Sequence, residues 1–325
     1  MACDTKILNG YGDGSLGAVT NPTGQINSYA NVTAYTSNSI TIGTPSLGVY
    51  ETFTAGKEIA IHVSAGSGAS ADTTYLGAKL HCKITAVSGS VLTVDKDFTA
   101  ILPLTAFGNY QVQAVTVANF KSLTLSSGSI TPPAYSVSNK YGGIILAKCT
   151  DAVIFSGGSI NLVDKGIPVA SAAYRPRTAQ EINGTADTDK YSGWENHITL
   201  RQFLLNAGDG AVMIMAKHYA QAGTASRIGG TTAGVQFTRG NVGGSTITLV
   251  CGDMTGFDPS IISKMKGSGQ GLGRCYIASN TKLRNDEGLY AYDVISNPAR
   301  LKSLRIKGYG NGSFGNVINP TAPLN

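Results

Sequence analysis

Carboxylates are the side chains of this chain whose chemistry is easiest to define, because a pair of them can hydrolyse a glycosidic bond. One carboxyl then acts as an acid and the other as a base or nucleophile, and the two lie about 5–10 Å apart. The chain has 19 acidic residues, and its i, i+2 pairs, Asp95 with Asp97 and Asp187 with Asp189, fall in segments with turn or loop composition. We expect solvated loop charges at these positions and no catalytic residue. The other acidic candidates for a glycan-cleaving site are Asp253, Asp258, Asp286 and Glu287.

Other reactive patterns are missing from the sequence. The four histidines form no H-x-H or H-E-x-x-H pair, so the sequence predicts no metal site. The Gly-rich run at residues 267–273 lacks the Lys-Ser/Thr pair of a phosphate-binding loop. The five cysteines are odd in number and widely spaced, which favours buried thiols over a disulfide framework. We therefore expect no cofactor.

Two irregular stretches, residues 164–200 and 252–273, interrupt the regular part of the sequence. The first carries the only tryptophan of the chain and a cluster of charged residues. Loops that leave a rigid scaffold commonly carry binding, and Tyr, Trp and Arg dominate contact hot spots. The residues that we expect to bind a partner are Tyr174, Arg175, Arg177, Tyr191 and Trp194.

The composition defines the elements that must position these residues. Charged residues make up 14% of the chain, hydrophobic residues make up 42%, and 41 of the 325 residues are glycine. Frequent glycine with abundant Ser, Thr, Asn, Val and Ile is typical of short β-strands joined by tight turns. The net charge of +6 comes from dispersed Lys and Arg with no basic run, so we expect no nucleic-acid binding. The composition therefore predicts an all-β protein.

Residues 28–120 are predicted to form a small β-barrel or sandwich, inserted near the N-terminus. Lys79, His81, Lys83 and Thr85 alternate with apolar residues, which indicates a strand with one wet face. The sequence Ser-Gly-Ser at residues 88–90 predicts a hairpin turn. The expected strands are Ser39–Gly43, Glu58–Ser64, Ala78–Val87, Val91–Val94 and Tyr110–Val117.

Residues 121–307 are predicted to form a parallel β-helix, or solenoid. SLTLSSGSI at residues 122–130 matches AVIFSGGSI at residues 152–160, and GIILAK at 143–148 matches VMIMAK at 212–217, an offset of 69 (212 − 143). Recurring units of strand, Gly-containing corner and strand are typical of solenoids, in which each coil stacks on the previous one. A pair of β-sandwiches is the competing architecture. Further strands are expected at Thr246–Cys251, Cys275–Ala278 and Leu301–Ile306.

The two ends of the sequence repeat each other. Residues 10–27, GYGDGSLGAVTNPTGQIN, match residues 308–325, GYGNGSFGNVINPTAPLN, at 11 of 18 positions. The shared glycines predict turns with positive φ. Because the motif flanks the other regions without recurring in them, we expect both copies, residues 1–27 and 308–325, to be docking or capping segments. The residues expected to serve assembly are Tyr11, Asp13, Asn21, Tyr309, Asn311 and Asn319.

The N-terminal segment GDGSLGAVTNPTG resembles the G-D-G-S-x-G-x-V openings of bacteriophage and prophage tail-fibre or virion proteins. Residues 53–58 and 84–94, FTAGKE and ITAVSGSVLTV, resemble the small β-domain that precedes Gly-rich β-solenoids in phage and bacterial surface adhesins. There a G-G-I-I coil follows, as at residues 142–145, although this chain lacks the long poly-Gly stretches of those adhesins. The resemblance covers about the first half of the chain. It implies a β-solenoid used in attachment or in a virion, and it supplies no site residues.

These features favour a non-enzymatic structural or attachment protein of a phage or related particle, such as a tail fibre or spike. The alternatives are a polysaccharide-degrading β-helix enzyme of tailspike type and a bacterial surface adhesin. Expected partners are further copies of the chain, with a trimer as the first expectation, other virion proteins, and a host-surface glycan or protein. The N-terminus lacks the apolar region of a secretory signal, and no apolar stretch is long enough to span a bilayer. We therefore expect a virion component made in the host cytoplasm without a signal peptide or membrane insertion.

Overall fold

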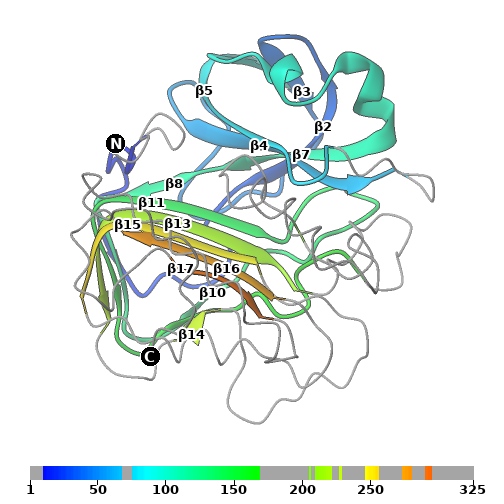
Figure 1. The fold of residues 1–325 in the computed structure, drawn as a ribbon. Coiled ribbons are helices and arrows are strands. Elements are labelled where there is room, and N and C mark those ends of the chain that lie inside the picture. Colours follow the sequence, from blue (N-terminus) through cyan, green and yellow to red (C-terminus); the bar gives the residue numbers. More distant parts are fainter. Residues whose placement is uncertain are drawn as a thin grey trace, which may run out of the picture.

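Two β-structures make up the described part of the chain: a closed antiparallel barrel and, below it in Figure 1, a stack of parallel strands. The structure is a computed structural model. From residue 227 onwards it describes side chains only for Leu249 and Cys251, and the burial of Gly252. The residues described are 10–67, 75–168, 205, 209–221, 227–228, 246–255, 273–279 and 290–294.

The barrel is a ring of six strands in the spatial order β2-β3-β6-β5-β4-β7. Apolar residues at alternate positions fill its interior, among them Ile59, Ile61 and Val63, which are fully buried. The five strands expected in this region are all present, with ends within two residues of those predicted, and Gly89 turns the expected hairpin with a φ of 58°. The strands are β2 (Tyr29–Tyr35), β3 (Ser39–Ile42), β4 (Glu58–Gly66), β5 (Lys79–Ser88), β6 (Val91–Val94) and β7 (Tyr110–Thr116).

Two short 3-10 helices, η1 (Phe98–Ala100) and η2 (Leu104–Asn109), connect β6 to β7. Asp97 starts η1, because its carboxylate accepts a hydrogen bond from the Thr99 N–H at 2.8 Å. The Phe98 ring, fully buried, packs edge-on against Tyr35 with ring centroids 4.6 Å apart. The connection therefore closes one end of the barrel core with aromatic side chains. None of the described helices is long and apolar enough to cross a membrane.

The second structure is a largely parallel sheet in the order β1-β9-β11-β13-β15-β16-β17, and we call each level of this stack a rung. β8 and β9 pair with successive halves of the long strand β11, which has an irregularity between Cys149 and Ala152. Only β17 runs antiparallel to its neighbour. The strands are β1 (Ala18–Thr20), β8 (Ala118–Phe120), β9 (Ser122–Leu125), β11 (Ile144–Phe155), β13 (Ala211–Gln221), β15 (Thr246–Thr255), β16 (Gly273–Ser279) and β17 (Tyr290–Val294).

After a corner, the chain adds one short strand per rung to a second parallel sheet, formed by β10 (Ser129–Ile130), β12 (Ser159–Ile160) and β14 (Arg227–Ile228). The expected 30-residue match is confirmed as a stacking register, since Ser129 pairs with Ser159. The offset of 69 is wrong: Ile144 pairs with Ala211, an offset of 67 (211 − 144). A shift of two residues keeps every side chain on its own face of the sheet, so the apolar pattern alone could not distinguish the two registers.

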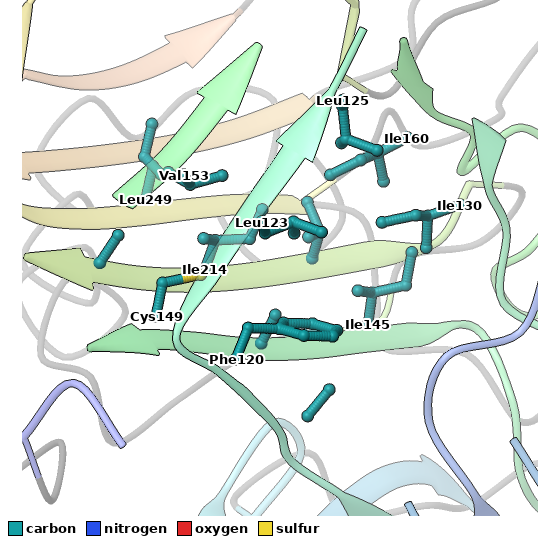
Figure 2. Packing of buried hydrophobic residues seen from close by; sticks show 14 of the residues in the cluster. Phe120, Leu123, Leu125, Ile130, Ile145, Cys149, Val153, Ile160, Ile214 and Leu249 are labelled. Atoms are coloured by element: carbon teal, nitrogen blue, oxygen red, sulfur yellow. The ribbon is translucent and has the colours of Figure 1, made fainter. Parts of the chain in front are cut away.

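The space between these two sheets is filled by apolar side chains from successive rungs (Figure 2). Leu123 lies beside Val153, its partner one rung along, and Ile130 lies beside Ile160. The free thiols of Cys149 and Cys251 are buried in this core and Cys82 is buried in the barrel, as expected for small apolar residues. The expected strand at 301–306 and the C-terminal copy at 308–325 lie outside the described residues.

Candidate functional site

The barrel covers the outer face of the parallel sheet, and we call this contact the joint (Figure 1). Its apolar part unites barrel residues such as Ala60 and Val115 with Ile144, Leu146 and Met213 of the rungs. Because the opposite face of the sheet lines the core of the rungs, the first halves of β11 and β13 are buried on both faces. This explains the nearly continuous apolar runs GIILA and AVMIMA, a pattern typical of parallel strands covered on both sides.

Barrel side chains close an edge of β11 that β8 leaves open. β8 pairs only with residues 147–149, so the backbone of Ile144 and Leu146 faces the barrel at this edge. Asn27 acts as a substitute peptide group: its Oδ1 accepts from the Leu146 N–H at 3.2 Å and its Nδ2 donates to the Leu146 carbonyl at 2.7 Å. The Tyr29 hydroxyl donates to the Ile144 carbonyl at 2.5 Å. An edge that would otherwise leave buried polar groups unpaired is thereby satisfied.

A second side-chain amide, that of Gln113, makes the same pair of hydrogen bonds with the backbone of Gly142, two residues before Ile144. Gln113 Oε1 accepts from the Gly142 N–H at 2.9 Å, and its Nε2 donates to the Gly142 carbonyl at 3.1 Å. Asn27 Nδ2 also donates to the carbonyl of Thr116, at the end of the barrel strand β7, at 2.7 Å. The bonded residues of the rung, 142, 144 and 146, alternate as one edge of a strand requires. The joint is therefore specific in register as well as apolar.

A cluster of ionisable side chains occupies the same joint. Lys148 of β11 is 1% exposed, and its Nζ lies 2.5 Å from Glu58 Oε1 of the barrel. His81 Nδ1 lies 3.6 Å from the same oxygen, too far for a hydrogen bond. Lys79, also buried, places its Nζ 3.2 Å from the sulfur of Met213. The Glu58 carboxylate, 12% exposed, thus has two basic neighbours, Lys148 and His81, while Lys79 lies beside Met213 and is influenced by the charge of Lys148.

Burial and charge set the protonation of this cluster. Burial alone would raise the pKa of Glu58, but His81 and the Lys148 ammonium outweigh it and the pKa is lowered. Burial lowers the pKa of Lys148, and Glu58 offsets part of that effect. Burial lowers the pKa of His81 to about 4 and, together with the Lys148 charge, lowers the pKa of Lys79 to about 7. At neutral pH the ion pair is therefore Glu58–Lys148, beside a neutral imidazole.

The wet face expected for β5 is wrong at its first two positions. Lys79 and His81 are buried, 7% and 6% exposed, whereas Lys83 and Thr85 further along the strand are exposed. The alternation is present, but the parallel sheet covers the polar face of the first half of the strand. A period-2 pattern shows that two faces differ, and it does not show what packs against either.

The N-terminal copy of the duplicated motif forms the first rung, and we call residues 10–23 the cap. Its strand β1 pairs in parallel with β9. Asn21 has a φ of 53°, and its Oδ1 accepts from the N–H groups of Ser126 and Ser127 at 2.8 and 2.9 Å. Among the expected assembly residues, Asn21 is thus placed in a direct contact with the next rung.

The other expected assembly residues differ in their surroundings. Tyr11 is half-buried against the apolar cluster of the joint. Asp13 is exposed and accepts a hydrogen bond from the Ser15 N–H at 2.9 Å. Burial would raise the pKa of Asp13, but the bonds to Ser15 and the charges of Lys57 and Lys83 lower it. Asp13 therefore shapes a local turn. The residues Tyr309, Asn311 and Asn319 lie outside the described residues.

Replacing Asn21 with alanine should lower the free energy of unfolding by about 1–2 kcal/mol, because two N–H groups lose their acceptor and alanine tolerates a positive φ poorly. Asn21→Asp, which keeps an acceptor oxygen, is the matched control and should stay closer to the wild type. Urea titration measures the stability, and hydrogen exchange at Ser126 and Ser127 locates the effect. Unchanged exchange at both amides in Asn21→Ala would contradict this role.

A pair of carboxyls lies where the chain enters the stretch at 164–200. Asp209, 5% exposed, accepts a hydrogen bond from the Asp164 N–H at 3.1 Å. Burial, reinforced by the charge of Asp164, raises the pKa of Asp209 to about 7. The Asp164 side chain is exposed, and its φ is 55°. A buried carboxyl with a raised pKa beside an exposed one is the pattern of an acid paired with a base or nucleophile.

The sequence did not single out Asp164 and Asp209 because they are separated by 45 positions (209 − 164). The only signal is Asp-Gly at the start of an apolar strand, which is also an ordinary turn. The residues expected to bind a partner, Tyr174, Arg175, Arg177, Tyr191 and Trp194, lie outside the described residues, as do the side chains of the acids at 187, 189, 253, 258, 286 and 287. Asp95 and Asp97 lie at the end of β6, where their carboxylates accept from the N–H groups of Lys83 and Thr99.

No protein-family model matches the chain, and no curated protein matches its sequence. Similar solved structures include the Gp54 tailspike of Acinetobacter baumannii bacteriophage AP22, in complex with A. baumannii capsular saccharide. The identity is 10%, the TM-score is 0.20, and the match covers 82% of this chain and 37% of that tailspike. Another is the tailspike protein gp49 from Pseudomonas phage LKA1, with 14% identity, a TM-score of 0.18, and coverage of 73% of this chain and 42% of that one. The chain thus spans well under half the length of these tailspikes.

Proposed function

We propose that this chain is a non-enzymatic structural and attachment protein of a phage-type particle. In this proposal the rungs are coils of a parallel β-helix that forms a rigid support, and the stretch at residues 164–200 contacts the host surface. The observation that carries the proposal is the joint, where buried amides and the Glu58–Lys148 pair fix the barrel to the rungs. A scaffold that presents a binding loop benefits from such rigidity, because little conformational entropy is then lost on binding. The resemblance of the N-terminal motif to phage virion proteins supports the same function.

One observation favours a second function, a glycan-cleaving enzyme of tailspike type. The Asp164–Asp209 pair offers a buried carboxyl with a raised pKa as acid and an exposed carboxyl as base or nucleophile. It lies at the beginning of the stretch that we expect to contact the host surface. The two functions differ in one measurable property, the release of reducing ends from a bound glycan.

The test is to incubate the purified chain with envelope polysaccharides of candidate hosts and to measure binding and reducing ends together. We expect saturable binding without release of reducing ends, and at least tenfold weaker binding for Trp194→Ala, in line with the cost of losing an aromatic hot spot. Asp209→Asn and Asp286→Asn should leave binding unchanged. Release of reducing ends that either Asn variant abolishes would establish the enzyme instead.

A further inference from the structure

The cap is held by a surface that we call the seat, formed by β9, the corner at Ser126–Ser127 and the segment at Asn119–Lys121. The backbone contributes hydrogen bonds along its whole length. The Leu16 N–H donates to the Asn119 carbonyl at 3.0 Å, the Lys121 N–H donates to Gly17 at 2.7 Å, and the Asn21 N–H donates to Thr124 at 2.8 Å. The Asn21 carboxamide then binds the two N–H groups of the corner. The seat therefore contacts both the backbone of the cap and one of its side chains, that of Asn21.

Two glycines of the cap are required by the closeness of the seat. At Gly12, with a φ of 87°, a Cβ atom would lie 2.2 Å from Asn119 Oδ1. At Gly14, with a φ of 68°, a Cβ atom would lie 2.8 Å from Thr150 Oγ1 of β11, which adjoins the seat. A side chain at either position would meet both a steric clash and an unfavourable backbone conformation. The sequence Gly-x-Gly of the cap is thus complementary to this surface.

The C-terminal copy keeps the residues that contact the seat in the N-terminal copy. With the offset of 298, the two close-packed glycines, the half-buried Val19, the Asn21 carboxamide and the proline after it recur unchanged. Within residues 10–23 the copies differ at four positions: the side chains at 13, 18 and 20 are exposed in the N-terminal copy, and the fourth difference replaces the half-buried Leu16 by phenylalanine. Variation thus concentrates on the side that faces away from the seat. The retained residues of the C-terminal copy are Gly310, Gly312, Val317, Asn319 and Pro320.

The similarity weakens where the N-terminal copy leaves the seat and enters the barrel. Gln25 Nε2 donates to the carbonyls of Asn27 and Ser46, at 3.0 and 3.2 Å. The C-terminal copy has Pro323 at the position of Gln25, and proline offers no such donor. Residues 308–321 therefore match most of the part of the motif that contacts the rungs. Among the following residues Asn325 matches Asn27, whereas the position of Gln25 does not match.

The outer edge of β1 does not provide a second seat. By the register of β1 with β9, Pro22 takes the position that Ser126 has in the seat. Proline has no N–H and cannot donate to an asparagine carboxamide. The pair of N–H groups that binds Asn21 is therefore not repeated at this level, and among the described residues β1 is the last strand at this end of the sheet.

We propose that residues 308–321 of one copy of this chain occupy the seat of a second copy, in place of its residues 10–23. The sheet order supports a second copy, because β1 and β17 lie at opposite ends of the sheet. Six strand spacings of about 4.8 Å separate them by about 29 Å. A copy stacked along this axis brings its seat next to the end from which the chain continues beyond β17. The contact is heterologous, and head-to-tail repetition generates a ring or a filament.

Residues 10–23 can leave the seat without unfolding the rest of the chain. Most of its side chains are exposed or half-buried, with Pro22 as the buried exception, whereas Ile26 and Asn27 beyond it are buried and bonded to barrel and rung. Exchange of residues 10–23 thus leaves Ile26 and Asn27 in place, and in this proposal Tyr309 replaces Tyr11 against the apolar cluster of the joint. Because the incoming segment makes the same contacts, the exchange replaces every hydrogen bond that it breaks.

Two full-length variants, Ser127→Cys and Thr321→Cys, test the exchange when they carry different tags and are mixed under mild oxidation. Thr321 corresponds to Thr23, an exposed residue of the cap that lies beside Gly128. We expect a disulfide-linked heterodimer at least fivefold above the yield of the control mixture, in which Ser138→Cys replaces Ser127→Cys at an exposed position outside the seat. Each variant alone should stay near the background set by the native cysteines, and an excess of the peptide 308–321 should suppress the heterodimer, whereas the Asn319→Ala peptide should not.

A heterodimer yield equal to the control would overturn the proposal. So would a Ser127→Cys/Thr321→Cys double variant that forms its disulfide only within one chain. Circular dichroism of each variant before mixing verifies that the fold is retained. The readout is assembly and involves no glycan, so its failure is distinguishable from failure of the proposed attachment function.

Discussion

Lys148→Met should lower the free energy of unfolding by about 3–5 kcal/mol, the usual cost of removing one partner of a buried ion pair. Methionine preserves most of the length of the side chain, so the effect isolates the charge. The Glu58 carboxylate would remain in the joint without its counter-ion, beside an imidazole whose pKa is lowered to about 4. The measurement is urea unfolding followed by circular dichroism.

Two controls separate the charge from the packing. Lys121→Met changes an exposed lysine in the segment between β8 and β9 and should alter the free energy of unfolding by less than about 0.5 kcal/mol. The double variant Glu58→Gln/Lys148→Met removes both charges and should recover a large part of the loss, because no uncompensated charge stays buried. A single variant Lys148→Met as stable as Lys121→Met would show that the pair does not hold the joint.

Five of the six barrel strands and the 30-residue register between two of the rungs could be predicted from the sequence because both depend on local patterns. Alternating apolar residues fixed β4 to β6 to within two residues, and the Ser-x-Gly-Ser-Ile corner gave the true 30-residue register. β2, with the sequence YANVTAY, was missed. Its alanines and asparagine have low strand propensity, and its place is fixed by pairing with β3 and β7.

The joint could not be predicted, because its partners are far apart in the sequence. Asn27 contacts Leu146, and Glu58 contacts Lys148, across about 90 to 120 positions. Polar residues in strands indicate solvent unless a second element covers them, and nothing local in β5 reveals the sheet over Lys79 and His81. The one available signal was Lys148 itself, a lysine at the end of the apolar run GIILA. A charge in a strand that is buried on both faces requires a partner of opposite charge.

The cap was found from the duplicated sequence, and its mechanism was not. The repetition predicted Asn21 as a residue for assembly, and the structure shows a contact of Asn21 within the chain, with the Ser126–Ser127 corner. Asp13, selected for the same reason, bonds within its own turn. Repetition alone treats every shared position alike, whereas the closeness of the two surfaces at Gly12 and Gly14 shows which shared positions are required by contact.

Lys79→Met should have the opposite effect to Lys148→Met and raise the free energy of unfolding at neutral pH by about 1–4 kcal/mol, the range found when buried charged groups are replaced by apolar ones. Burial of the Lys79 side chain and the nearby charge of Lys148 both oppose an ammonium at Lys79. Methionine would place a thioether next to Met213 in an already apolar part of the joint. Urea unfolding of the two variants under one set of conditions compares them directly.

The pH dependence of this gain identifies its cause. The unfolded chain binds a proton at Lys79 below pH 10.5, whereas the folded chain binds it only below about pH 7. Between these values the unfolded state holds more protons, so the stability of the wild type falls as the pH falls from 10.5 to 7. Lys79→Met lacks this dependence, and its stability advantage over the wild type should shrink steadily from pH 7.5 to pH 10, since all other titrating groups are shared by the two proteins.

An advantage that stays constant over this range would assign the gain to packing, and a loss of stability at pH 7.5 would mean that the Lys79 ammonium supports the joint. Because burial and the charge of Lys148 both oppose an ammonium at Lys79, opposite outcomes at the two lysines would show that the joint accommodates one ammonium and not two.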